Sequence, residues 1–248
     1  MLLSTMHAEI VFYLLLFLVA FLYSSVGHGG ASGYLALMAF FSFAPETMRP
    51  TALILNLFVS LTAFVQYYRG GHFRWRLFWP FALASIPAAF IGGLIVMDAE
   101  WYKKILGVLL LFPVIRLVGV KFNSENTDKE QTLPASLLIG AAIGLFSGMI
   151  GIGGGIILSP VILLLHWAKM KETAAVSALF IFVNSLAGLA GIFTKGFEYQ
   201  PEIVWMIGIA FVGGLLGAYL GAKRFNHLFL KRLLAVVLLM ASIKLIFA

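Results

Sequence analysis

Glycine-rich runs interrupt the apolar sequence at two places, about half a chain apart. They are Gly27-His28-Gly29-Gly30-Ala31 and Gly151-Ile152-Gly153-Gly154-Gly155, and a short apolar segment follows each one. A bilayer core offers no water to backbone N–H and C=O groups, so a break there persists only where it lines a cavity or is buried by protein. Two breaks at matching positions predict a transport site built from interrupted helices.

The apolar segments that follow the glycines, 31–44 and 155–167, are expected to be short helices. The first N–H groups of a helix lack intrahelical acceptors, and the helix dipole adds positive charge there. If one hairpin enters from each membrane face, the two helix starts meet near the midplane and favour an anion. Close packing of small residues is the alternative explanation of the glycines. The predicted substrate-binding residues of the loops are Gly27, His28, Gly29, Gly30, Ala31, Ser32, Gly151, Gly153, Gly154, Gly155 and Ile156.

Three polar side chains could add to this site. Asn56 and Asn184 lie in apolar segments and could donate hydrogen bonds to a substrate, although hydrogen bonding between helices explains each one equally well. His28 stands where the second run has Ile152, and an ionisable group at membrane depth is a functional hypothesis. Its imidazole titrates near neutral pH and could compensate charge or carry a proton. The alternative is a histidine bonded to a carbonyl in the hairpin tip.

The composition specifies the kind of protein that must position these residues. Hydrophobic residues make up 62% of the 248 and charged residues 11%, with a mean hydropathy of +1.02. Soluble domains carry about a quarter charged residues, so the chain is predicted to be a polytopic membrane protein. The net charge of +7 resides mostly in short loops and does not indicate nucleic-acid binding. The absence of cysteine excludes disulfides and thiolate chemistry, and no metal or other cofactor is implied.

Ten apolar segments can be drawn along the chain, and the polar stretch 121–132 divides them into two sets of five. We therefore expect a first repeat over 1–120, a cytoplasmic linker over 121–132 and a second repeat over 133–248. The second segment of each half is about 20 Å long as a helix, which is short of the roughly 30 Å hydrocarbon core. The prediction is an all-α integral membrane fold with about eight transmembrane helices and two re-entrant short helices.

The basic residues predict the orientation of the chain. Twelve Lys and Arg residues fall on one side of the predicted topology and five, including Arg49, on the other. The positive-inside rule puts the twelve in the cytoplasm and both termini outside, in a cell inner (plasma) membrane. Each half makes an odd number of crossings, so the halves are inverted repeats. Arg49 is expected to contact lipid headgroups, and Gly213-x3-Gly217-x3-Gly221 is expected to pack helices closely.

The second glycine run, separated by four residues from Pro160, resembles the G-x-G-G-G-x4-P signature of the sulfite exporter TauE/SafE family. The first run is a weaker copy, with Ala31 in place of the last glycine and Ala36 in place of the proline. The resemblance covers essentially the whole chain. It implies membrane export of small sulfur oxyanions or organosulfonates, and the departures in the first copy leave the substrate open.

We therefore expect a secondary transporter rather than an enzyme, exporting sulfite or an organosulfonate by alternating access between the two hairpins. Its partners are the small anion and the lipid bilayer, and the sequence leaves its oligomeric state open. An anion channel is one alternative. A rhomboid-like intramembrane protease is another, because Gly30-Ala31-Ser32-Gly33 reads as G-x-S-G, with Ser32 as nucleophile. The repeat of the glycine run without the serine speaks against it.

Overall fold

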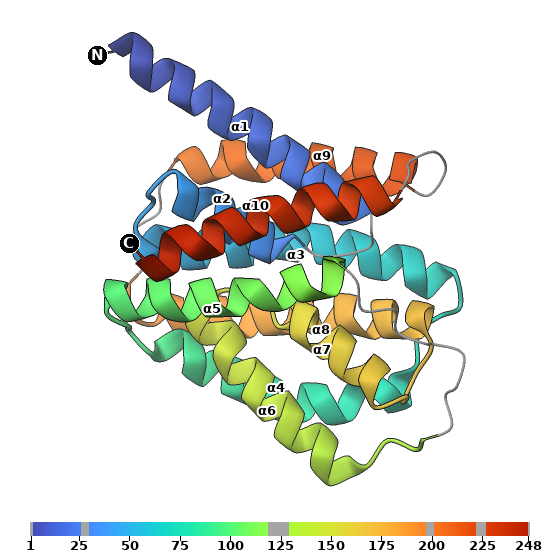
Figure 1. Ribbon diagram of the computed structural model, residues 1–248. Helices are drawn as coiled ribbons and strands as arrows, with labels where there is room; N and C mark the ends of the chain where they lie inside the picture. Colours follow the sequence, from blue (N-terminus) through green and yellow to red (C-terminus); the bar gives the residue numbers. More distant parts are fainter. Residues whose placement is uncertain (1, 26–29, 119–128, 197–200, 222–226, 248) are drawn as a thin grey trace.

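A computed structural model describes residues 2–25, 30–118, 129–196, 201–221 and 227–247, and within these ranges the chain forms only helices and turns. The helices lie in one bundle, and the two chain ends are on the same side of the view in Figure 1. The first half contains α1 (Leu2–Ser25), α2 (Ala31–Phe40), α3 (Pro45–Arg69), α4 (Trp75–Leu94) and α5 (Ala99–Val118). The second contains α6 (Leu133–Ile150), α7 (Gly155–Leu164), α8 (Met170–Phe193), α9 (Glu202–Gly221) and α10 (His227–Phe247).

Helix length separates two kinds of element, as the sequence predicts. Among the described residues, α3, α4, α6 and α8 are each long and apolar enough to cross a membrane. By contrast, α2 and α7 have 10 residues each, or about 15 Å of helix. Large apolar side chains such as Leu83, Leu138 and Trp205 are exposed on the bundle surface, as expected for contact with lipid. The chain is therefore an all-helical, multi-pass membrane protein.

Glycine determines where the second short helix begins. Gly151 ends α6 with φ +88°, and its N–H donates to the Ser147 carbonyl at 2.8 Å. Gly153 and Gly154 both have φ +77°, and Gly154 caps the start of α7. Three left-handed residues within four positions would be strained for any side chain with a Cβ, so only glycine lets the backbone reverse so tightly. Gly30, with φ +68°, caps α2 in the same way.

The main helix contacts join the two halves of the chain. Helix α4 packs on both α6 and α8, and α9 packs on α1. Helix α5 packs on α10, and α3 packs on α8. At the α4–α6 contact, Gly140, Gly144 and Gly148 lie directly against the backbone of α4. At the α1–α9 contact, Gly213 and Gly217 lie against the carbonyls of Phe17 and Phe21, so the predicted small-residue packing is confirmed at these two positions. Missing side chains let the helix backbones approach closely in both places.

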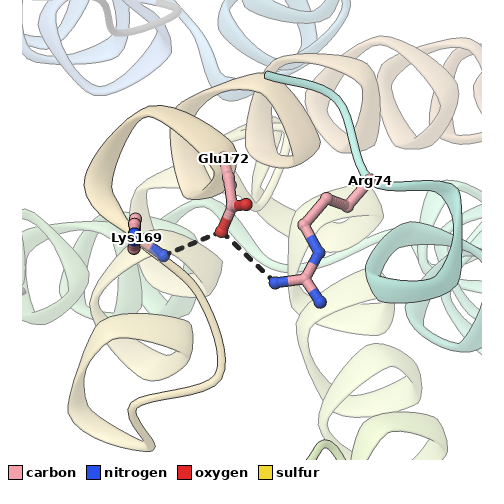
Figure 2. Close-up of polar contacts among 3 residues, drawn as sticks. All are labelled: Arg74, Lys169 and Glu172. Carbon is pink, nitrogen blue, oxygen red and sulfur yellow. Dashed lines mark hydrogen bonds and ion pairs between the residues drawn. The ribbon is translucent and has the colours of Figure 1, made fainter. Parts of the chain in front are cut away.

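Polar contacts distinguish the two ends of the bundle. At the end where α3 stops and α4 and α8 begin, here called the Arg74 end, Arg74 forms an ion pair with Glu172 at 3.3 Å (Figure 2). At the opposite end, here called the Arg49 end, Arg49 donates to the carbonyls of Ile95 at 3.0 Å, Gly148 at 3.1 Å and Gly92 at 3.3 Å.

These bonds give Arg49 partners that the sequence did not predict. Its guanidinium joins the start of α3 to the ends of α4 and α6. Lys244 acts similarly, because its ammonium donates to the carbonyls of Ala39 at 3.2 Å and Phe40 at 2.6 Å, where α2 ends. Cations near the last carbonyls of a helix interact favourably with its dipole. Helix ends at the Arg49 end are thus tied together by side chains.

Candidate anion site

The starts of α2 and α7 line a single cavity of about 100 Å³, which is flanked by α3 and α8. One short helix comes from each half of the chain, and their first residues face the same space. The cavity is lined by Tyr23, Gly30, Ala31, Ser32, Ser60, Ala63, Tyr67, Ile152, Gly155, Ile156, Ser159, Met170, Lys171, Thr173, Ala174, Ser177, Ala178 and Ile181. Of these, Met170 and Lys171 are exposed, so the cavity extends to the surface at the Arg74 end.

On the α2 side, the cavity wall combines the first helical turn with one buried hydroxyl pair. Ala31 and Ser32 are the first residues of α2, so their N–H groups have no acceptor within the helix. The Ser32 hydroxyl lies 2.8 Å from the Tyr23 hydroxyl, and both side chains are buried. This contact holds the start of α2 against α1.

On the α7 side, Gly155 and Ile156 begin the helix and likewise leave their N–H groups without an intrahelical acceptor. Ser159 lies one turn further along, where its Oγ is 2.9 Å from the Gly155 carbonyl and 2.8 Å from the Ser177 Oγ of α8. These bonds fix the first turn of α7 on α8. Two sets of free backbone donors therefore converge on one small cavity, which suits an anion.

The predicted loop residues divide into two groups. Gly30, Ala31, Ser32, Gly155 and Ile156 line the cavity. The remaining described glycines lie behind it: Gly151 lies against the backbone of Arg49, Gly153 against Asn56 and Gly154 against Ile143 and Phe180. Gly27, His28 and Gly29 lie outside the described residues.

The two asparagines are not among the residues that line the cavity. Asn56 is fully buried, and its amide donates to the Ile152 carbonyl at 3.4 Å and to the Ser185 hydroxyl at 3.5 Å. Asn184 donates to the carbonyl of Phe180 one turn earlier in its own helix, at 2.8 Å. Asn56 thus connects α3 to the second glycine loop and to α8, which is the helix-to-helix role weighed for it from sequence.

Several lining residues were not selected from the sequence, among them Ser159, Thr173 and Lys171. The signal that could have found them is helical spacing, because residues four apart share a helix face. Ser159 lies four positions after Gly155, and Thr173 four positions before Ser177. Lys171 carries no local signal of this kind, since a lysine at the start of a membrane helix is expected on topological grounds alone.

A model of the family described as sulfite exporter TauE/SafE matches residues 12–245 of the chain. The chain belongs to this family. Among TauE/SafE relatives, a probable membrane transporter protein of Sinorhizobium fredii, y4hK, is 36% identical over 93% of this chain and 95% of its own length. The probable membrane transporter protein YdhB of Bacillus subtilis is 26% identical over 86% of this chain and 89% of its own.

No solved structure matches this TauE/SafE chain. The family and the relatives are named as membrane transporters, which confirms the prediction that the chain is not an enzyme. The contact of Ser32 agrees with this assignment, because its hydroxyl is paired with the Tyr23 phenol, which is not the histidine base that a protease nucleophile needs. The chain is a membrane transporter protein with a small-molecule substrate.

Proposed function

We propose that this protein is a secondary transporter that exports a small anion, sulfite or an organosulfonate, by alternating access around the cavity between α2 and α7. The observation that carries the proposal is that the first residues of two short helices, one from each half, line the same cavity. A single helix start is a weak anion site, but two that face one small cavity act together.

The chemistry of the cavity supports an anion over a cation. Lys171 is the one charged side chain among the described lining residues, and the other polar side chains there carry hydroxyls. A cation would instead need carboxylate or carbonyl oxygens. We assign the contacts with the substrate to the backbone of Gly30 to Ser32 and of Gly155 and Ile156.

The loop residues behind the cavity have a supporting role in this proposal. Gly151, Gly153 and Gly154 allow the sharp turn, and Asn56 holds α3 against the second loop and α8. Asn184 bonds within α8. Gly27, His28 and Gly29 stay candidate substrate contacts on the sequence argument alone. His28 stays the candidate for charge compensation or proton coupling, on the sequence argument alone.

We infer two inverted repeats, 1–120 and 133–248, joined by a linker at 121–132. The pairing of helices supports a two-fold relation between them, and the distribution of basic residues supports the inversion. In such repeats each helix of the first half is equivalent to the helix five places later, so α1 is equivalent to α6 and α4 to α9. The α4–α6 contact is then equivalent to the α9–α1 contact. The α5–α10 and α3–α8 contacts correspond to themselves, as they should at a two-fold axis. Such repeats are the usual framework of alternating access, with the substrate between them.

The two ends of the cavity support a state that is open to one side only. The Arg74 end carries the exposed Lys171, whereas the Arg49 end is tied by bonds from Arg49 and Lys244 to helix carbonyls. The distribution of basic residues assigns the Arg74 end to the cytoplasm and both termini to the outside of an inner (plasma) membrane. In the export cycle, an anion would enter from the cytoplasm, and the contacts at the Arg49 end would then open.

The proposal is tested by measuring binding of anions to the purified full chain by calorimetry. The panel contains sulfite, sulfate, thiosulfate, sulfoacetate and short carboxylates. We expect saturable binding of sulfite or a sulfonate and weaker binding of the carboxylates. Equal heats from every anion, or none at all from the sulfur oxyanions, would refute the proposed substrate class.

A further inference from the structure

The wall of the cavity formed by α3 and α8 contains two hydroxyl groups that have nothing to bond. Ser60 of α3 and Thr173 of α8 are 0% and 1% exposed, and both line the cavity. Within the described part of the chain, neither Ser60 Oγ nor Thr173 Oγ1 has a hydrogen-bond partner. A buried polar group without a partner is unfavourable, so its presence calls for an explanation such as a ligand.

Other hydroxyls in the cavity wall and in α3 do have partners. Ser159 and Ser177 also line the cavity, and they bond each other at 2.8 Å. Thr62, two residues after Ser60 in α3, bonds the Phe58 carbonyl one turn earlier at 2.8 Å. Ser60 and Thr173 make neither kind of bond. Their hydroxyls are therefore available as donors to a molecule in the cavity.

The positive charge at the mouth of the cavity favours a negatively charged molecule. Lys171 precedes Thr173 by two residues, is exposed, and forms no salt bridge among the described residues. The adjacent Glu172 is turned to other partners: Figure 2 shows its carboxylate between the Arg74 guanidinium, at 3.3 Å, and the backbone N–H of Lys169, at 3.0 Å. The acidic neighbour is thus paired, and the ammonium of Lys171 remains the uncompensated charge at the mouth.

The rest of the cavity wall is apolar and favours a molecule with an apolar end. Ala63, Ala174, Ala178, Ile156 and Ile181 line the same cavity and offer no side-chain hydrogen bonds. An oxyanion surrounded by oxygens on all sides, such as sulfate, would leave some of them facing these apolar groups. A sulfonate carries its oxygens at one end and an apolar group at the other, so it can satisfy both parts of the wall.

Resting on the proposed transport of small anions, we propose that Ser60, Thr173 and Lys171 form the part of the site that selects its substrate. The two hydroxyls donate to sulfonate oxygens, and Lys171 attracts the anion at the mouth. The apolar wall then receives a short alkyl group, so the site prefers an alkanesulfonate to sulfate. The selection resides in α3 and α8, separate from the backbone donors of α2 and α7.

The test measures binding of ethanesulfonate, sulfite and sulfate to the purified full chain in detergent by calorimetry. The variants are Ser60→Ala, Thr173→Val and Lys171→Gln, and the matched control is Thr62→Val, which removes a hydroxyl from α3 that does not line the cavity. We expect the wild type to prefer ethanesulfonate. Removing either cavity hydroxyl should weaken ethanesulfonate binding about tenfold, or about 1.4 kcal/mol, while Thr62→Val binds as the wild type does.

Stability without ligand separates a binding role from a structural one. Ser60→Ala and Thr173→Val each remove an unpaired buried hydroxyl, so the thermal midpoint of the empty protein should stay the same or rise. A lowered midpoint with unchanged affinity would show a structural role and overturn the proposal. Lys171→Gln should weaken binding and reduce its dependence on salt, because screening acts on an exposed charge; an unchanged salt dependence would remove Lys171 from the site.

Two outcomes distinguish this inference from the proposed function. If the wild type binds ethanesulfonate and both hydroxyl variants bind it equally well, the selection by Ser60 and Thr173 is wrong and anion transport stands. If the wild type binds sulfite or sulfate more tightly than ethanesulfonate, the preference for an alkyl group is wrong. If it binds none of the three anions, the proposed function fails and this inference fails with it.

Discussion

The contact between α4 and α6 offers a quantitative test of the fold, because a single added methyl group at Gly144 has no room. A Cβ at this position would lie 2.3 Å from the Ser85 carbonyl oxygen and 2.6 Å from the Ser85 Cα. A comfortable carbon–oxygen contact is about 3.3 Å, so the helices would have to separate by about 1 Å. Both nearest atoms are backbone, and they cannot move aside as the end of a side chain can.

The expected cost follows from comparison with Gly208 in α9, where a Cβ meets nothing within 4 Å. Replacing glycine by alanine inside a helix gains up to about 1 kcal/mol from helix propensity, and this gain is shared by Gly144→Ala and Gly208→Ala. The difference between the two variants is therefore the packing cost alone. Overpacking costs about 1–3 kcal/mol, and an unyielding backbone contact places Gly144→Ala in the upper half, at about 2–3 kcal/mol.

The assay is unfolding of each full-length variant in mixed micelles by a rising fraction of sodium dodecyl sulfate, followed by circular dichroism. Gly208→Ala should unfold at the same detergent fraction as the wild type or a higher one. Gly144→Ala should unfold earlier, by the amount given above. Equal stability of the two alanine variants would refute the close approach of α4 and α6.

Three further predictions concern the Arg49 end and the second glycine loop. Arg49→Gln should lower the free energy of unfolding by about 2 kcal/mol, since hydrogen bonds from a charged group contribute about 1.5–3 kcal/mol. Arg49→Lys should recover less than half of the lost stability. Full recovery would contradict the fork-like bonding of the guanidinium to three carbonyls. Gly154→Val should reduce the yield of folded protein in size-exclusion chromatography, because φ there is +77° and Ile143 and Phe180 leave no space; a monodisperse variant would argue against this turn. Asn56→Ala should weaken ethanesulfonate binding less than Ser60→Ala does, because Asn56 lies behind the cavity; a larger loss in calorimetry would return Asn56 to the substrate contacts.

The sequence predicts the short helices well because glycine constrains the backbone locally. Runs of glycine before short apolar segments specify where α2 and α7 begin, and the left-handed φ angles of Gly30 and Gly154 are the physical reason. The Gly213 and Gly217 contacts were predicted for a similar reason, since their spacing marks a face without side chains. Each of these signals belongs to one segment and needs no knowledge of its neighbour.

Other features depend on which helix lies opposite, and the sequence does not contain that information. An asparagine in an apolar helix can face a cavity or another helix, and only the position of Ile152 and Ser185 places Asn56 against the second loop. Arg49 was expected at the headgroups because the ends of α4 and α6 could not be placed beside it. Thr173 is an ordinary polar residue near a helix start until α3 and α7 are packed around it.

The most direct test of the proposed transporter is counterflow in vesicles that contain the purified protein. Vesicles are loaded with unlabelled ethanesulfonate or sulfite and diluted into a trace of the labelled anion, with protein-free vesicles as the control. Alternating access around one site predicts saturable uptake and a transient accumulation of label that requires unlabelled anion inside. Uptake that rises linearly with concentration and ignores the internal anion would contradict alternating access and favour a channel.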